Sequence, residues 1–417
     1  MKIKYYDFAE AEISDDRIKG ILEPQLIEGY DRTRFEKELT KLLKECLPQK
    51  LQGVKKLLIL VDDITRQTPV AWILPKVLEI ANQHGLKCND ITLLVATGTH
   101  RAMSYSEQCR KYGKDVVDRI KVRFHDYKRD VVDLGKTSSG TPVTVNKLVI
   151  EHDMTIGIGM VVPHRVAGFS GGGKIVQPGI SGERTTGWTH WLSAQFEGRE
   201  ILGKIDNPVR NEIEEVAKIA GLSFIINVVL DRKGKPIKTF AGDPLPTFKK
   251  AATFSRKIYG VKAEKSEIVI TDSYPADIEM WQAAKGVYSA DLVLKRDGVL
   301  ILCSPCIEGV GAEFGDLIVR FGYRGYNDVK KLVESGKLDN LIVAAHLVHV
   351  GRVIKDKGTG VLVSPGIEPE IAKKIGFIPA KDLKEAVEIA ESIAGKKDIT
   401  VCYNGGEILP IPCPTSG

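Results

Sequence analysis

Short runs of apolar residues alternate along this chain with longer stretches that are apolar on one side only. Residues 57–61 (LLILV) predict a buried strand, residues 70–83 predict a helix ending near Gly85, and residues 91–96 predict the next strand. Strand, helix and strand in this order form the β-α-β unit of a parallel sheet, whose strands are covered on both faces. The pattern therefore predicts an α/β fold.

Further along, the pattern predicts a hairpin, a helix at residues 248–259, and then a second alternation of strands and helices. The hairpin pairs residues 222–230 with 236–240 around a glycine-containing turn. The later strands are predicted at residues 268–272, 298–303, 341–345 and 399–402.

The sequence therefore predicts two α/β domains with mostly parallel sheets and an active-site cleft between them. Residues 1–262 would form an N-terminal cofactor-binding domain and residues 266–404 a C-terminal domain. Residues 405–417 would form a tail that packs back on the first domain.

Composition is that of an ordinary soluble protein, since the 417 residues are 43% hydrophobic and 27% charged. The formal net charge is +6, and basic residues are interspersed with acidic ones, so we expect no nucleic-acid partner. The first residues lack the apolar core of a signal peptide, and no apolar run is long enough to span a bilayer. We expect a cytoplasmic protein with no membrane partner.

Seven cysteines are an odd number for a disulfide framework, so reduced thiols are expected. Cys303 and Cys306 have zinc or redox spacing, but they end an apolar run and have no second pair, which favours a strand-to-loop turn. His346 and His349 are three residues apart beside an apolar run. That run favours a strand end with structural histidines over a helix face that carries a site.

Candidate chemistry centres on a glycine-rich segment, SGGGK, from Ser170 to Lys174. Consecutive glycines are expected where the backbone needs unusual dihedral angles or approaches a ligand closely. Such a turn can point N–H groups at an anion, and its lysine can act as a charge or, once deprotonated, as a nucleophile. A flexible surface loop with a solvated lysine is the alternative.

A phosphate-binding P-loop is the sharpest competing interpretation, because residues 168–174 fit the G-x-x-x-x-G-K part of that motif. The motif needs Ser or Thr after the lysine to hold magnesium, and this chain has Ile175. Phosphate binding stays possible at this point, whereas ATP hydrolysis is disfavoured.

Other polar motifs follow the first two predicted strands directly. Asp62 and Asp63 follow the first strand, and Gly98, Thr99 and His100 follow the second. Ligands bind beyond the carboxyl ends of parallel strands, so this position favours a functional role. A charge pair at a helix N-terminus is the simpler interpretation of the two aspartates.

Four separated motifs resemble the nickel-dependent lactate racemase family, the 2-hydroxyacid racemases and epimerases that use a nickel-pincer nucleotide. The motifs are DDITRQTP at 62–69, GTHR at 98–101, the segment 163–190, and WQAAK at 281–285. Their order and spacing fit, and the resemblance runs over nearly the whole chain. Several motifs in order are far harder to meet by chance than one glycine loop.

This resemblance implies a cofactor and the residues that hold it. Lys174 would carry pyridinium-3,5-bisthiocarboxylic acid mononucleotide as a thioamide, and His190 would supply the protein ligand to nickel. His100 and His164 match the acid/base pair of the family, one for each enantiomer. Soft sulfur donors with one imidazole suit Ni(II), and histidine exchanges protons near neutrality.

The resemblance also implies a carboxylate clamp and a cofactor surround. Arg66 and Lys285 would hold the substrate carboxylate. The residues expected around the cofactor are Asp63, Gln282, Ser170, Gly171, Gly172 and Trp281. Some family members have tyrosine at the position of Trp281, which leaves the substrate open; packing of Trp281 in the core is the alternative.

The function expected from the resemblance is a racemase or epimerase of 2-hydroxy acids, lactate or a related 2-hydroxycarboxylate. Hydride would leave C2 reversibly through a 2-keto acid. The implied partners are the small-molecule substrate and the maturation proteins that make the cofactor. A non-catalytic metal, phosphate or nucleotide-binding protein that uses the glycine loop and the histidines is the alternative.

Overall fold

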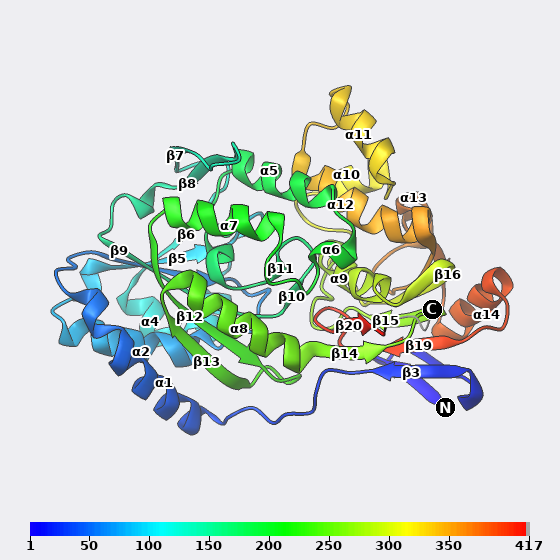
Figure 1. Cartoon of the computed structure of the whole chain (residues 1–417), viewed down its shortest axis with the longest axis horizontal. Coiled ribbons are helices and arrows are strands. Elements are labelled where there is room, and N and C mark those ends of the chain that lie inside the picture. Colours follow the sequence, from blue (N-terminus) through cyan, green and yellow to red (C-terminus); the bar gives the residue numbers. More distant parts are fainter. Residues whose placement is uncertain (414–417) are drawn as a thin grey trace.

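The computed structural model describes residues 1–413 and consists of two α/β lobes side by side (Figure 1). Each lobe is built on a six-stranded sheet, in the orders β13-β12-β9-β4-β5-β6 and β18-β17-β16-β15-β19-β3. Within these two sheets, every strand pairing is parallel except that of β12 with β13. The predicted α/β class is confirmed.

The first lobe combines its sheet with eight helices. Its sheet strands are β4 (Leu57–Asp62), β5 (Ile91–Ala96), β6 (Lys121–Phe124), β9 (Met154–Met160), β12 (Leu222–Leu230) and β13 (Pro236–Gly242). Its helices are α1 (Arg32–Cys46), α2 (Val70–Gln83), α3 (Tyr105–Tyr112), α4 (Lys114–Arg119), α5 (Glu183–Ala194), α6 (Gly198–Ile201), α7 (Pro208–Ile219) and α8 (Pro244–Tyr259).

The second lobe is assembled from both ends of the chain. Its sheet strands are β3 (Ile18–Leu22), β15 (Ser266–Asp272), β16 (Leu294–Cys303), β17 (Gly358–Val363), β18 (Ile378–Ala380) and β19 (Ile399–Cys402). Its helices are α9 (Met280–Asp291), α10 (Gly315–Phe321), α11 (Tyr326–Glu334), α12 (Leu341–Gly351), α13 (Pro369–Ile375) and α14 (Leu383–Ala394).

Four two-stranded pairings complete the structure. They are β1 (Lys2–Tyr5) with β2 (Ala9–Glu12), β7 (Val131–Lys136) with β8 (Pro142–Asn146), β10 (Pro163–His164) with β11 (Gly168–Phe169), and β14 (Gly260–Ala263) with β20 (Leu409–Pro412). The predicted tail thus contributes β20, and its last residues, 414–417, lie outside the described residues.

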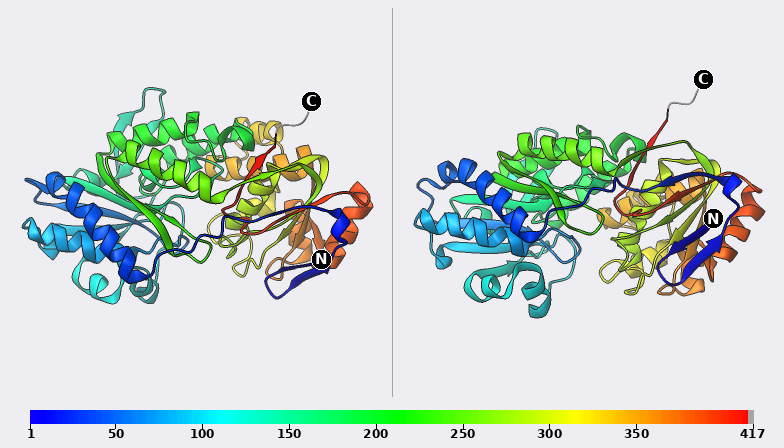
Figure 2. Two further views of the ribbon diagram at one scale, coloured as in Figure 1. Left: turned by 60° about the horizontal axis from the view of Figure 1, so that its bottom comes forward. Right: turned by 90° about the horizontal axis from the view of Figure 1, so that it is seen from below.

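The N-terminal strands lie in the second lobe, whereas the division predicted from sequence puts residues 1–262 in one unit. Strand β3 pairs with β19, and the Tyr5 hydroxyl donates hydrogen bonds to the Ile270 and Cys402 carbonyl oxygens at 3.2 and 3.1 Å. Figures 1 and 2 show the N-terminal hairpin beside the red strand β19, and the chain then crossing to α1 in the other lobe. No local pattern marks such a crossing, because the pairing joins residues from opposite ends of the chain.

The elements predicted from apolar periodicity agree with the structure in most places. Helix α2 and strand β5 have the predicted bounds, and β12 and β13 form the predicted hairpin. Residues 341–345 are an exception, because they begin helix α12 instead of forming a strand. Every residue of α12 after Leu341 is buried, so the helix has no exposed polar face. Its sequence is therefore a largely apolar run, a pattern that is also typical of a buried strand.

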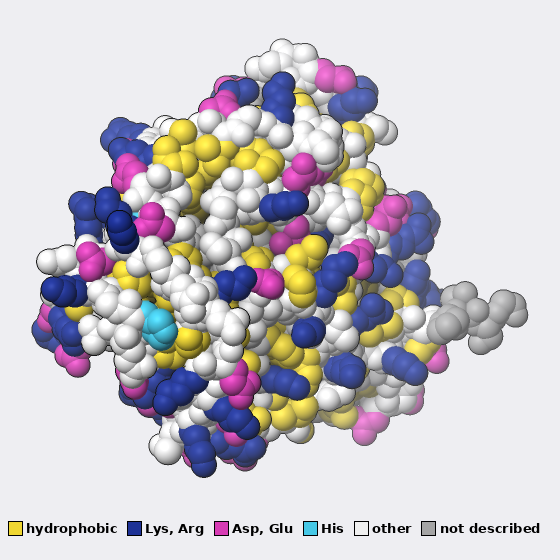
Figure 3. All heavy atoms as spheres, turned by 60° about the vertical axis from the view of Figure 1, so that its left-hand side comes forward, with side chains coloured by type: hydrophobic (Ala, Val, Ile, Leu, Met, Phe, Trp, Pro, Cys, Tyr) yellow, Lys and Arg dark blue, Asp and Glu magenta, His cyan; other side chains and the backbone are white. Residues whose placement is uncertain are grey.

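No helix within residues 1–413 is both long and apolar enough to cross a membrane. On the face drawn in Figure 3, basic and acidic side chains are interspersed, with small apolar patches between them.

Candidate active site

A cavity of about 170 Å³ lies where the two lobes meet, at the carboxyl ends of the first-lobe strands. Asp62 ends β4, and the loop from Thr97 to His100 follows β5. The cavity brings together eleven of the twelve residues predicted to form the site: Asp63, Arg66, His100, His164, Ser170, Gly171, Lys174, His190, Trp281, Gln282 and Lys285. Gly172, the twelfth, follows Gly171 in the chain but does not line the cavity.

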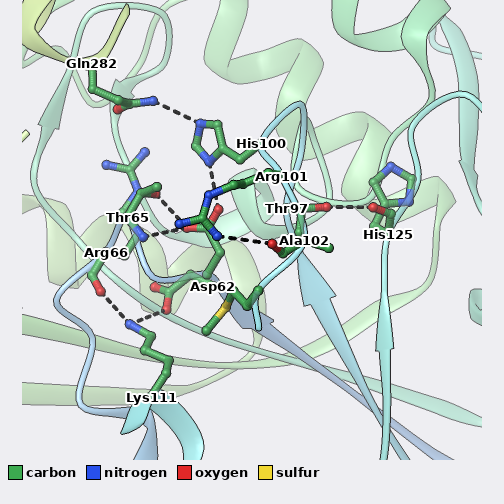
Figure 4. Close-up of polar contacts among 12 residues, drawn as sticks. Asp62, Thr65, Arg66, Thr97, His100, Arg101, Ala102, Lys111, His125 and Gln282 are labelled. Carbon is green, nitrogen blue, oxygen red and sulfur yellow. Dashed lines mark hydrogen bonds and ion pairs between the residues drawn. The ribbon is translucent and has the colours of Figure 1, made fainter. Parts of the chain in front are cut away.

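Four of these side chains form one hydrogen-bonded chain across the lobes. Figure 4 shows the contact between His100 and Gln282 within it. His100 Nδ1 donates to Asp63 Oδ2 at 2.7 Å, and the Gln282 amide nitrogen is 2.9 Å from His100 Nε2. Lys285 Nζ donates to Gln282 Oε1 at 2.6 Å. Two of these residues come from first-lobe loops and two from α9, so the chain of bonds couples the lobes through the predicted site.

Asp63 is the fixed end of this chain. It is 3% exposed, and its Oδ1 accepts hydrogen bonds from the Thr65 amide and hydroxyl at 3.0 and 2.6 Å. Burial raises the pKa of the Asp63 carboxyl, but His100 and the Thr65 hydrogen bonds outweigh burial and hold that pKa well below its ordinary value. Asp63 is therefore an anion that orients the His100 ring and leaves Nε2 toward the cavity.

Asp62 has a different environment from Asp63. Its carboxylate is bonded to the Thr68 hydroxyl and lies 3.2 Å from Lys111 Nζ, which also donates to the Arg66 carbonyl oxygen at 2.5 Å. Burial raises the pKa of Asp62, and Lys111 opposes this. The arrangement ties the loop after β4 to α3, so Asp62 holds the position of Arg66.

Arg66 and Lys285 bring two basic side chains to the cavity from opposite lobes. Burial lowers the pKa of Lys285 well below its ordinary value, and Arg66 lowers it further. The buried carboxyl of Glu407, near both cations, has its pKa raised by burial to about 7, and both cations oppose this rise. An anionic ligand between Arg66 and Lys285 would relieve their repulsion.

Lys174 lies in a single helical turn, η5 (Gly172–Ile175), at the wall of the cavity. Burial lowers the pKa of its amine well below the ordinary lysine value, and Arg66 and Lys285 lower it further. A lysine with a depressed pKa has a larger neutral, nucleophilic fraction. The environment therefore fits covalent attachment of a ligand at this nitrogen.

His164 and His190 are held as neutral imidazoles around Lys174. His164 Nδ1 accepts a hydrogen bond from the Val166 amide at 3.2 Å, and His190 Nδ1 donates to the Thr186 carbonyl oxygen at 2.8 Å. Burial, followed by the charge of Lys174, lowers the pKa of His164 far below normal and that of His190 to about 4. The His190 tautomer leaves Nε2 with a free lone pair, as a metal ligand requires.

The glycine loop packs too tightly for side chains. Gly171 and Gly172 have φ angles of 78° and 59°, and a Cβ on Gly171 would lie 2.6 Å from Val161. The Gly172 amide donates to Asn227 Oδ1 at 3.0 Å, and the Gly173 amide to Glu214 Oε1 at 3.1 Å. Both amide N–H groups already donate to acceptors within the protein, and the Glu214 carboxylate would repel a phosphate. The loop is therefore not arranged to bind a phosphate.

Helix α12 supplies site residues that sequence reasoning discounted. His346 and His349 line the cavity together with Tyr288 of α9, and both histidines lie on a helix instead of at a strand end. The Asn340 side chain accepts hydrogen bonds from the amides of Ile342 and Val343, both at 3.0 Å. An N-cap of this kind is the signal that could have identified the helix.

His346 forms part of an aromatic wall. Its ring stacks on Trp281 with 4.0 Å between ring centroids, and the hydroxyls of Tyr288 and Tyr323 lie 3.2 and 3.3 Å from its two nitrogens. His349 Nε2 is 2.9 Å from Ser193 Oγ on α5, and its buried Nδ1 has no protein partner. Trp281 therefore lines the cavity, although core packing was the alternative.

The protein side chains of residues 1–413 include no group of three or more His, Cys, Asp or Glu placed to hold a metal ion. A metal in this cavity would need most of its ligands from a bound cofactor, and an imidazole such as that of His190 could supply one. Cys303 and Cys306 are both free and buried, in agreement with the strand-to-loop turn predicted for them.

Parallel strands that end at a polar cavity between two lobes are typical of α/β enzymes, and the fold and site place this chain in that class. The comparisons assign the family. Residues 6–200 match the model of the lactate racemase N-terminal domain, and residues 261–409 that of the lactate racemase C-terminal domain. The chain belongs to the lactate racemase family, a family of isomerases.

Individual relatives agree with this assignment. The lactate racemases of Thermoanaerobacterium thermosaccharolyticum and Lactiplantibacillus plantarum are each 30% identical to this chain; the alignments cover 95% of it, and 96% and 95% of the relatives respectively. The lactate racemase apoprotein structure from T. thermosaccharolyticum matches with a TM-score of 0.86 at 28% identity, covering 99% of each chain. A Thermotoga maritima structure matches with a TM-score of 0.76, covering 93% of this chain and 99% of that one, but its 22% identity supports the fold alone.

Proposed function

We propose that this protein is a nickel-pincer-nucleotide-dependent racemase or epimerase of 2-hydroxy acids. The observation that carries the proposal is the convergence of Lys174, His190, His100 and His164 with Arg66 and Lys285 on one cavity of about 170 Å³. The family assignment supports the racemase class, and the side chains fit the cofactor chemistry.

Hydroxyacid racemisation explains why such a site is needed. The hydrogen on C2 of a 2-hydroxycarboxylate is a very weak acid, because the neighbouring carboxylate resists a second negative charge. Removing that hydrogen as hydride while a base takes the hydroxyl proton gives a planar 2-keto acid that accepts hydride on either face. The nickel-pincer nucleotide, when bound, supplies a reversible hydride acceptor.

His100 and His164 are the proposed bases for the two enantiomers. His100 presents Nε2 to the cavity because Asp63 holds Nδ1–H. The Nε2 lone pair, which here faces the Gln282 amide, would accept the hydroxyl proton when the substrate replaces that contact. Burial keeps His164 neutral. Its Nδ1 accepts from the Val166 amide, so Nε2 carries the ring hydrogen in this structure, and His164 would accept the hydroxyl proton in the other tautomer. Arg66 and Lys285 would hold the substrate carboxylate and so fix C2 between the two imidazoles.

Lys174 and His190 are the proposed attachments for the cofactor. The depressed pKa of Lys174 makes its amine available for a thioamide link, and His190 Nε2 is free to bind nickel. Asp63, Gln282, Trp281, Ser170, Gly171 and Gly172 would surround the nucleotide. The proposal includes cofactor-maturation proteins as partners, and a cytoplasmic location, where the seven free thiols would stay reduced.

The test is the intact mass of the protein made together with the cofactor-synthesis proteins and nickel, followed by peptide mapping. We expect a mononucleotide-sized addition on Lys174, and interconversion of D- and L-2-hydroxy acids by the loaded protein. An unmodified Lys174, beside a family control that is modified, would overturn the tethering. Absence of racemase turnover in the loaded wild type, together with weaker nickel binding by His100→Ala, would instead favour a metal carrier.

A further inference from the structure

A second cavity, of about 140 Å³, adjoins the candidate active site. The two cavities share one wall, made of Asp63, Thr65, Thr99, His100, Trp281 and Gln282. This second space, which we call the side cavity, lies between the first-lobe loops after β4 and β5 and the second-lobe segments 275–279 and 308–314. It therefore opens directly beside the imidazole that would accept the substrate hydroxyl proton.

The inner surface of the side cavity is largely apolar. Ile64, Ala276 and Ile278 contribute aliphatic groups, and Trp281 and Phe314 pack with 5.1 Å between ring centroids. A cavity of about 140 Å³ can hold several groups the size of a water molecule. The methyl group of lactate would fill only a small part of this volume. An apolar chain entering it would gain burial free energy in proportion to the surface it covers.

The charged residues of the side cavity are mostly acidic. Asp277, Glu279, Glu308 and Glu313 line it, and Arg101 is the one lining cation among the described residues. Arg101 is already bound by Glu107, with nitrogen-to-oxygen distances of 3.0 and 2.9 Å, and Glu308 is 3.9 Å from it. In Figure 4, Arg101 and Gln282 lie on either side of the His100 ring. A second carboxylate on the substrate would meet negative charge here, with no free cation to receive it.

Three of the four substituents of C2 have an assigned place in the candidate active site. The carboxylate would lie between Arg66 and Lys285, the hydroxyl at an imidazole, and the C2 hydrogen toward Lys174 and His190. The remaining substituent would then be left for the neighbouring side cavity, past the residues that the two cavities share. We infer that the side cavity binds the carbon chain beyond C2 of the substrate, and that this chain is uncharged and longer than a methyl group. This inference rests on the proposed racemase function.

The test compares substrates on the cofactor-loaded protein. We expect kcat/KM for 2-hydroxy-4-methylpentanoate or for a neutral-chain aldonate to exceed that for lactate at least tenfold, and that for malate to be lower still. The first two probes distinguish an aliphatic from a hydroxylated chain. Racemisation in which lactate or malate is preferred would overturn the inference and leave the proposed function standing. If none of the acids reacts or binds, the proposed function fails, and the inference fails with it.

Two variants test the cavity itself. Ala276→Phe fills the side cavity, and we expect the ratio of kcat/KM for the long acid to that for lactate to fall at least tenfold. Ala102→Phe adds the same bulk on an exposed residue that lines neither cavity, so the ratio should not change. Glu308→Lys should raise the relative kcat/KM for malate. The corresponding 2-keto acid is the proposed intermediate and has no hydride to give up, so its binding to cofactor that carries no hydride can be measured by calorimetry. It should show the same Ala276→Phe preference change; an unchanged ratio in both measurements would overturn the assignment.

Discussion

Asp63 Oδ2 and His100 Nδ1 are 2.7 Å apart, and this contact fixes which nitrogen of the imidazole faces the cavity. The two residues follow neighbouring parallel strands, β4 and β5, so sheet geometry brings them together. A buried carboxylate beside a ring N–H selects one tautomer and supports the cation that forms when the ring accepts a proton.

Replacing Asp63 by Asn should lower kcat by on the order of 100-fold while the fold is kept, because the amide supplies no charge and can hold the wrong tautomer. Steady-state racemisation and circular dichroism measure the two effects. Lys295→Ala removes an exposed partner of Glu267 far from the cavity and is the control for general damage. A kcat within twofold of wild type in Asp63→Asn would contradict the orienting role.

Lys285→Ala should raise KM for a 2-hydroxy acid roughly 10- to 100-fold, the loss expected for a charge-assisted hydrogen bond to a carboxylate. Its effect on kcat should be smaller than that of Asp63→Asn. Lys285→Arg keeps the cation and should recover part of the affinity. Initial-rate kinetics with both enantiomers test this, and equal KM values for wild type and Lys285→Ala would exclude the carboxylate contact.

Gly171→Ala should destabilise the protein by about 2–4 kcal/mol, since the new Cβ would lie 2.6 Å from Val161 at a φ angle of 78°. Gly221→Ala is a matched control, because Gly221 has a φ angle of 77° and nothing within 4 Å of the added Cβ. The control should cost only the backbone strain, about 1–2 kcal/mol. Urea unfolding of both variants measures the difference, and equal losses would show that the loop can shift.

His346 should make stability depend on pH. Burial lowers its pKa to about 3, below the value in an unfolded chain, so the folded state favours the neutral ring. The stability that neutral His346 contributes is fully present above the pKa of histidine in the unfolded chain, about 6.5. It is lost as pH falls from there toward 3. Between pH 7 and pH 5 it should amount to on the order of 2 kcal/mol.

His346→Gln keeps hydrogen-bonding groups near Tyr288 and Tyr323 but does not titrate. Its free energy of unfolding, from urea titrations at both pH values, should decrease less on acidification than that of wild type. The same decrease in both proteins would mean that other groups cause the acid sensitivity.

The sequence predicted β4, α2 and β5 because each carries a local apolar period, and it placed the polar motifs at the strand ends for the same reason. Ten residues of α12 are buried on all sides, so that helix has no period to detect. His346 and His349 were discounted with it. Their role as cavity wall depends on how α12 packs against α5 and α9, which is a property of the assembled lobes.

The sequence predicted the four residues of the hydrogen-bonded chain from Asp63 to Lys285, but not the bonds between them. The family resemblance pointed to Gln282 and Lys285 as site residues. Sequence spacing does not show that Gln282 contacts His100, which is 182 positions away. The side cavity has no sequence signature either, because its two halves come from loops of different lobes.

The pairing of the N-terminal strands with the second lobe has a consequence for synthesis on the ribosome. The Tyr5 hydroxyl bonds to a carbonyl oxygen 397 positions later, so its partner is translated roughly 20 to 80 s after Tyr5 itself at bacterial or eukaryotic elongation rates. The strands of the first-lobe sheet all emerge within that interval. These early residues are therefore among the last to find their place, and until β19 is made, nascent β3 has no strand to pair with.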